Sequence, residues 1–114
     1  MSPTRRSILV IVTTRTADEA THLADSIVTA RLAAGAQISG PIRSIYWWQG
    51  AKQDEEEWKL TIITTTDLLQ PLEAHIKANH AYITPQIIAT EISAGSADYL
   101  EWISAETMRT DASS

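Results

Sequence analysis

One histidine and one glutamate are the residues of this sequence best suited to bind a metal ion. His80 ends a predicted helix beside a loop, and Glu57 closes the acidic run Asp54–Glu57 close to a predicted sheet. An imidazole is a borderline ligand and a carboxylate offers a hard oxygen, so this pair would suit Cu(II) or Zn(II) in a chain without cysteine. Two plainer interpretations stay open. A histidine also favours the negative end of a helix dipole, and an acidic run also protects a hairpin edge from wrong pairing.

Adjacent aromatic residues form a second candidate site. Tyr46, Trp47 and Trp48 follow one another on the outgoing arm of a predicted hairpin. Their rings could stack on a planar ligand or on a cation. Aromatic residues in such a position are more often the anchors of a protein interface.

No catalytic constellation can be recognised by spacing. The sequence has no G-x-S-x-G element, no phosphate-binding P-loop and no cysteine nucleophile. His75 and His80 are not spaced to place two ligands on one helical face, and His22 falls on the polar side of its helix. The segment Thr13–Thr16 offers Arg15 but no glycines for an acylphosphatase-like phosphate loop. We therefore expect a protein that is not an enzyme.

Length and composition predict one small domain. It should cover residues 1–114, with a core over about 8–104 and a polar tail over about 107–114. The net charge is −5 and the nine basic residues are scattered, so no positive stripe could follow a nucleic-acid backbone. No apolar run approaches the roughly 20 residues of a membrane span. The lack of cysteine fits a reducing compartment, and we expect a cytoplasmic protein that binds neither nucleic acid nor membrane.

The strongest structural signal is a long hairpin over Ser44–Thr66. Every second residue of Trp58–Ile62 is large and apolar, so these side chains share one face of a strand. Gly50 tolerates a positive φ angle and marks the point where the chain reverses. We expect the polar segment Ala51–Glu57 to lie between the two arms.

The rest of the chain alternates between strand and helix patterns. The continuous apolar run Ile8–Val12 predicts a central strand that is buried on both faces. Thr16 and Glu19 form a capping box for a helix that we expect to stop at Gly35. The remaining predicted elements are a strand interrupted at Gly40-Pro41, a helix capped by Asp67, a strand over Gln86–Ile92, and a helix over about 97–105 that is capped by Ser96 and has Tyr99, Leu100 and Ile103 on its inner side.

This order of elements predicts an α+β fold. With right-handed crossovers it gives a ferredoxin-like split βαβ sandwich (βαββαβ plus a C-terminal helix), with an antiparallel sheet and a long hairpin between its second and third strands. The helices would cover one face of the sheet. The other face would carry Ile63 and the aromatic arm of the hairpin, and a face this apolar should not stay in contact with water. We therefore expect the chain to self-associate.

Several motifs of this chain resemble the CutA family of divalent-cation tolerance proteins, in order and with matching spacing. They are Arg31-Leu32-Ala33-Ala34, Ser44-Ile45-Tyr46-Trp47-Trp48-Gln49-Gly50, Thr64-Thr65, Asn79-His80 and Tyr82-Ile83-Thr84-Pro85. The resemblance implies a cytoplasmic homotrimer of ferredoxin-like subunits, linked to tolerance of copper and other divalent metals. Long hairpin strands would pair between the subunits, with Tyr46, Trp47 and Trp48 at the interface.

The same resemblance implies a likeness to PII-type signalling trimers, which bind small effectors in clefts between subunits. Such a cleft would be lined by Trp47, Gln49, Tyr82 and Thr84, the last two from a neighbouring subunit. The sequence also departs from the family pattern. It has Gly35 where the family usually has cysteine, Ala51 and Ile63 where lysine is common, and Ala81 in place of proline.

The first hypothesis is therefore a non-catalytic homotrimer that acts in tolerance of divalent metals, copper above all, with direct binding of the metal ion as one route. Because no thiolate is available, such binding would use His80 and Glu57. The alternatives are a PII-like sensor of a small effector, and a purely structural trimer that scaffolds other proteins.

Overall fold

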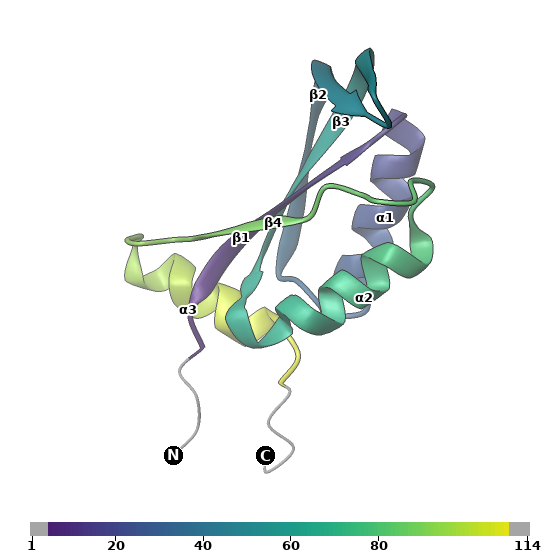
Figure 1. Cartoon of the computed structure of the whole chain (residues 1–114). Helices are drawn as coiled ribbons and strands as arrows, with labels where there is room; N and C mark the ends of the chain where they lie inside the picture. Colours follow the sequence, from purple (N-terminus) through teal and green to yellow (C-terminus); the bar gives the residue numbers. More distant parts are fainter. Residues whose placement is uncertain (1–4, 110–114) are drawn as a thin grey trace.

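The computed structural model describes residues 5–109 and contains one four-stranded antiparallel sheet with three α-helices (Figure 1). The strand order in the sheet is β2-β3-β1-β4. The elements are β1 (Ser7–Thr14), α1 (Ala17–Thr29), β2 (Gly35–Trp48), β3 (Ala51–Thr65), the 3-10 turn η1 (Thr66–Leu68), α2 (Leu69–Asn79), β4 (Ile88–Glu91) and α3 (Ala97–Glu106). This is the predicted ferredoxin-like α+β sandwich.

Strand β1 lies in the middle of the sheet, between β3 and β4, as its apolar sequence predicts. Its alternate residues Ile8, Val10 and Val12 are buried in the core beneath α1 and α2. Leu9 and Ile11 point to the opposite face and are only half-buried. The expectation that β1 is buried on both faces is therefore wrong for the single chain, because its helices α1 and α2 share one side of the sheet (Figure 1).

Helix α1 begins as predicted but ends early. The Thr16 hydroxyl accepts the Glu19 backbone N–H at 3.1 Å, while the Glu19 carboxylate accepts the N–H of Arg15 instead of closing the box on Thr16. The helix ends at Thr29, and Arg31 takes the left-handed conformation with φ 61°. Backbone hydrogen bonds from Arg31 to Val28 and from Leu32 to Ile27 complete a Schellman motif. Gly35 is consequently not the helix stop but the first residue of β2.

Strands β2 and β3 form the long hairpin, which projects beyond the helices (Figure 1). The reversal takes only two residues, Gln49 with φ 50° and Gly50 with φ 80°, the combination of positive φ angles found in a type I′ turn. The expected polar segment between the arms is therefore absent, and Ala51–Glu57 belongs to β3. A break in register between Ser39 and Ile42 confirms the predicted irregularity at Gly40-Pro41.

The second half of the chain differs from prediction at the start of α2 and in β4. Asp67 does not cap the helix, because its carboxylate is paired with Arg5 and the helix begins two residues later, after η1. Strand β4 is limited to Ile88–Glu91, which pair with the first half of β1. The residues between α2 and β4 therefore run as a loop along the end of β1.

Helix α3 partly covers the sheet face opposite α1 and α2. Its cap is the predicted one, since the Ser96 hydroxyl accepts the Tyr99 N–H at 3.3 Å. Ile103 is buried, but Tyr99 is 44% exposed and not on the inner side as predicted. Beside this helix Ile63 is only 5% exposed, whereas Ile88 of β4, the cross-strand partner of Ile11 on this face, is 55% exposed. The open apolar surface of the second face therefore includes β4 as well as the hairpin.

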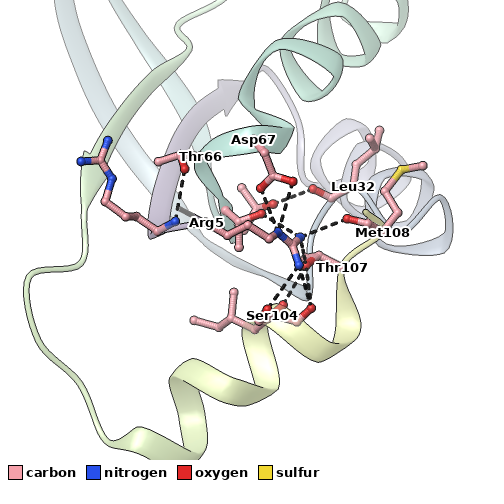
Figure 2. A network of polar contacts seen from close by, with 11 residues as sticks. Arg5, Leu32, Thr66, Asp67, Ser104, Thr107 and Met108 are labelled. Carbon is pink, nitrogen blue, oxygen red and sulfur yellow. Dashed lines mark hydrogen bonds and ion pairs between the residues drawn. The ribbon is translucent and has the colours of Figure 1, made fainter. Parts of the chain in front are cut away.

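The guanidinium of Arg5 ties the start of the chain to α3 (Figure 2). Its side chain is only 12% exposed and pairs with Asp67 at 3.1 Å. All three guanidinium nitrogens donate hydrogen bonds, and the acceptors are the side chains of Asp67, Thr65, Ser104 and Thr107 and the backbone carbonyls of Ser104 and Met108. The network fixes the last turn of α3 against the sheet.

Candidate functional site

A cavity of about 570 Å³ lies between the outer half of the hairpin and the loop that joins α2 to β4. Thr13 at the end of β1 and Arg15 just after the strand line it. The hairpin contributes Tyr46, Trp48, Gln53, Glu55 and Glu57, and the loop contributes residues 81–86. A volume of about 300 to 1,000 Å³ is usual for a small-molecule site.

The alternation of side chains along β2 decides which aromatic residues line this cavity. Tyr46 and Trp48 point to its side of the hairpin, together with the cross-strand partner Gln53. Trp47 lies between them on the opposite face and is 73% exposed. The sequence analysis predicted that Trp47 and Gln49 line the cleft, but neither lines this cavity. The residues of β2 that do line it are Tyr46 and Trp48.

The predicted cleft residues Tyr82 and Thr84 do line this cavity, and they do so beside the hairpin of their own chain. The Tyr82 hydroxyl donates a 2.7 Å hydrogen bond to Oε2 of Glu57, whose side chain is buried with only 5% of the residue exposed. Burial, and then the hydrogen bond and the negative charge of Glu57, raise the pKa of Tyr82 above its ordinary range. Tyr82 therefore remains a neutral donor that stabilises a carboxylate in a poorly solvated place.

A second tyrosine–carboxylate pair stands beside the first. The Tyr46 hydroxyl donates to Oε2 of Glu55 at 2.9 Å. This hydrogen bond is the main cause that raises the pKa of Tyr46. Glu55 and Glu57 are two residues apart on one strand and line the same cavity.

His80 connects the loop between α2 and β4 to the end of β1. Its Nδ1 accepts the backbone N–H of Tyr82 at 3.0 Å, so the ring proton is on Nε2, which donates to the Thr13 carbonyl at 2.7 Å. Its ring also contacts the Tyr82 ring, with 4.7 Å between centroids. With both nitrogens engaged, His80 holds Tyr82 in position toward the hairpin.

The predicted metal pair is not assembled into one preformed site. His80 lines a separate cavity of about 430 Å³, together with Asp18, Glu19 and His22, whereas Glu57 lines the cavity at the hairpin. Within residues 5–109 no group of three or more His, Cys, Asp or Glu side chains is placed to hold a metal ion. His75 contacts the Ser26 hydroxyl at 2.9 Å and joins α1 to α2. The described part of the single chain therefore does not present a preformed coordination sphere.

Gln53, Glu55 and Arg15 are among the cavity residues that the sequence analysis did not assign to the cleft. The alternation that places Glu57 on one face of β3 also places Glu55 and Gln53 there, so the period of two was a usable signal. Arg15 had no such signal. Its guanidinium lies 5.5 Å from the centroid of the Tyr82 ring, a contact that only the folded chain creates.

Fold and cavity together define a small α+β sandwich with a projecting hairpin and a polar–aromatic cavity beside the outer half of that hairpin. A sequence profile of the family described as CutA1 divalent ion tolerance protein matches residues 8–106. The chain belongs to this family. It shares 42% identity over 106 residues with the chloroplastic protein CutA 1 of Oryza sativa subsp. japonica, covering 93% of this chain and 60% of the relative.

Bacterial relatives and solved structures support the same family membership. The divalent-cation tolerance protein CutA of Thermus thermophilus is 35% identical over 87% of this chain and 96% of its own length. The crystal structure of CutA1 from Oryza sativa superposes with a TM-score of 0.90 at 41% identity, covering 96% of this chain and 100% of that one. The structure of the Thermus thermophilus protein superposes with a TM-score of 0.87 at 34% identity, covering 90% of this chain and 99% of that one. The chain spans about three-fifths of the full length of the plant relatives.

No helix within residues 5–109 combines the length and the apolar character needed to cross a membrane.

Proposed function

We propose that this protein is a non-catalytic, cytoplasmic homotrimer that acts in tolerance of divalent metals, copper among them. The relatives named divalent-cation tolerance proteins support the metal-related role. The observation that carries the assembly is the hairpin, which projects from the sandwich with large apolar side chains on both faces. These side chains are Ile45 and Trp47 on one face, 61% and 73% exposed, and Tyr46 and Trp48 on the other, 36% and 40% exposed.

Self-association would remove this surface from water. Burying apolar area is worth about 25 cal/mol per Å², and aromatic side chains are the usual anchors of interfaces. A cyclic trimer lets each hairpin pack against the next chain with identical contacts, so no exposed copy remains. Analytical ultracentrifugation tests the assembly: at micromolar concentration we expect a species of three times the 12.6 kDa chain mass. A single protomer under the same conditions would contradict it.

Direct binding of Cu(II) or Zn(II) by His80 and Glu57 is the more specific part of this proposal. It requires the Nε2 atom of His80 to release the Thr13 carbonyl and a ligand from outside the chain to complete the ion's coordination. Calorimetric titration of the wild type and His80→Ala with CuCl₂ and ZnCl₂ tests the assignment. Weaker binding by the variant supports His80 as a ligand, and equal affinity removes it.

A sensor of a small effector is the second candidate, and the cavity beside the hairpin favours it. The cavity is large enough for a small molecule, and its wall includes β2 and β3, so a ligand there would contact the arms of the projecting hairpin. In an assembled trimer, Trp47 and Gln49 of one hairpin could add to the cleft of a neighbour. Thermal-shift screening against metal salts, nucleotides, small anions and organic cations separates the candidates, since a sensor should respond to a non-metal ligand.

A further inference from the structure

The cavity beside the hairpin carries an excess of one negative charge. Its charged side chains are Glu55, Glu57 and Arg15. Tyr46 and Tyr82 are neutral, because the hydrogen bond to Glu55 raises the pKa of Tyr46, and burial, followed by the hydrogen bond to Glu57, raises the pKa of Tyr82. Each carboxylate already accepts one hydrogen bond from a tyrosine hydroxyl, at Oε2. A ligand with a single positive charge would balance the remaining charge.

The walls of this cavity are aromatic as well as acidic. The rings of Tyr46, Trp48 and Tyr82 all line it. The negative face of such a ring attracts a cation, and the attraction is stronger when the cation is shielded from water. The cavity already contains an internal example, because the guanidinium of Arg15 lies 5.5 Å from the centroid of the Tyr82 ring.

These features select among classes of ligand. An anion would have to approach Glu55 and Glu57, and Arg15 alone does not reverse the sign of the site. A divalent metal ion would need three or more close ligands, and residues 5–109 offer no such group. An organic cation needs no fixed coordination geometry and loses little hydration against an aromatic wall.

We propose that the cavity formed by Tyr46, Trp48, Glu55, Glu57 and Tyr82 binds a small organic monocation of the alkylammonium class. The positive group lies against the aromatic walls and close to the carboxylate of Glu57, whose burial makes its charge act through a medium that screens poorly. This inference gives a ligand class to the effector-sensor candidate and rests on it, but it is independent of metal binding by the protein.

Calorimetric titration of the full chain with tetramethylammonium chloride at constant ionic strength tests the proposal. We expect saturable binding to one site per chain. Glu57→Gln keeps an oxygen to accept the Tyr82 hydrogen bond but removes the charge, and should weaken binding about tenfold. Glu56→Gln is the matched control, because this neighbour is exposed on the opposite face of β3, and it should bind like the wild type.

A second pair of variants keeps the test valid if Glu57→Gln does not fold. Trp48→Leu should weaken binding, whereas Trp102→Leu, at a tryptophan with the same 40% exposure on α3, should not. No saturable binding, or equal losses in Trp48→Leu and Trp102→Leu, would overturn the proposal. A chain that responds to nucleotides or anions but not to tetramethylammonium would remain a sensor and refute only the cationic ligand. A chain that binds zinc and no other ligand would refute both the effector sensor and the cationic ligand.

Discussion

The hydroxyl of Tyr82 donates a 2.7 Å hydrogen bond to the buried carboxylate of Glu57, joining two residues that are 25 positions apart in the chain. This bond connects the loop after α2 to the hairpin, and His80 holds the loop from the other side. The cavity therefore owes its shape to a few polar contacts between the loop, β1 and the hairpin. Each contact can be tested by a conservative substitution.

Tyr82→Phe should destabilise the fold by about 1.5 to 3 kcal/mol, because the variant leaves a buried charged carboxylate without its donor. Urea unfolding at pH 7 measures the loss. Tyr99→Phe is the control: Tyr99 is 44% exposed on α3, and removal of its hydroxyl should change stability by less than about 0.5 kcal/mol. Equal losses in the two variants would show that the Tyr82 bond does not stabilise the chain.

The raised pKa of Tyr82 predicts that the stability of the wild type depends on pH at alkaline values in a way that the stability of Tyr82→Phe does not. The folded state holds the phenol proton more tightly than the unfolded chain, in which the pKa of tyrosine is about 10. The stabilisation is therefore complete below about pH 10 and is lost as the pH rises above that value. Between about pH 10 and 12 the wild type should lose stability more steeply than Tyr82→Phe, as followed by urea midpoints. Parallel slopes would contradict the coupling.

Arg5→Lys should cost about 3 kcal/mol of unfolding free energy. A lysine cannot reproduce the planar fork that serves Asp67, Thr65 and the end of α3 (Figure 2), and partners left unpaired in a poorly solvated place are costly. Arg6→Lys is the matched control, since the adjacent Arg6 pairs with Glu91 at the surface, with 64% and 61% of the two side chains exposed. The free energy of unfolding of Arg6→Lys should differ from that of the wild type by less than about 0.5 kcal/mol. Similar chemical denaturation midpoints for both variants would argue against a stabilising network.

Gly40→Ala should destabilise by about 1 to 3 kcal/mol through overpacking. A β-carbon at this position would lie 2.7 Å from the Trp58 ring, which packs against the hydrophobic core. Gly35→Ala is the comparison, because its β-carbon would meet Trp102 at an ordinary 3.4 Å. The midpoint of thermal unfolding should be well below that of the wild type for Gly40→Ala and close to it for Gly35→Ala. The reverse order would show that the contact with Trp58 is not limiting.

Ile45→Glu should shift the proposed trimer toward the single chain, because it places a charge on the most open face of the hairpin, where Ile45 is 61% exposed. Burying an unpaired carboxylate in an interface is costly. Ala74→Glu adds the same charge to the exposed surface of α2 and should leave the sedimentation profile unchanged. If both variants sediment like the wild type, this face of the hairpin does not form the interface.

Several parts of the fold could be predicted because their signals are local. The alternation around Leu60, the Thr16 cap, the Ser96 cap and the reversal at Gly50 each depend on residues within a few positions of one another. Arg31 shows the limit of such rules, because it occupies the left-handed position usually given to glycine, and α1 therefore ends before Gly35.

The cavity depended more on tertiary structure. Tyr82 and Thr84 were placed in a cleft on the strength of a resemblance, and Glu57 was singled out for its position, but the hydrogen bond between Tyr82 and Glu57 has no sequence pattern. The assignment of Trp47 rather than Trp48 to the cavity was a choice between two faces of one strand. That choice depends on the side from which the loop approaches, which adjacent residues cannot show.

The sequence by itself determined the order of strands and helices, the hairpin and the family, because periodicity, capping and short motifs express interactions between near neighbours. Only the tertiary structure decided that Arg5 reaches Asp67 across 62 positions, that both ring nitrogens of His80 are engaged, and that two carboxylates share a cavity with three aromatic rings. The reason is physical: such contacts depend on the angles at which elements pack, and these angles arise from the whole core at once.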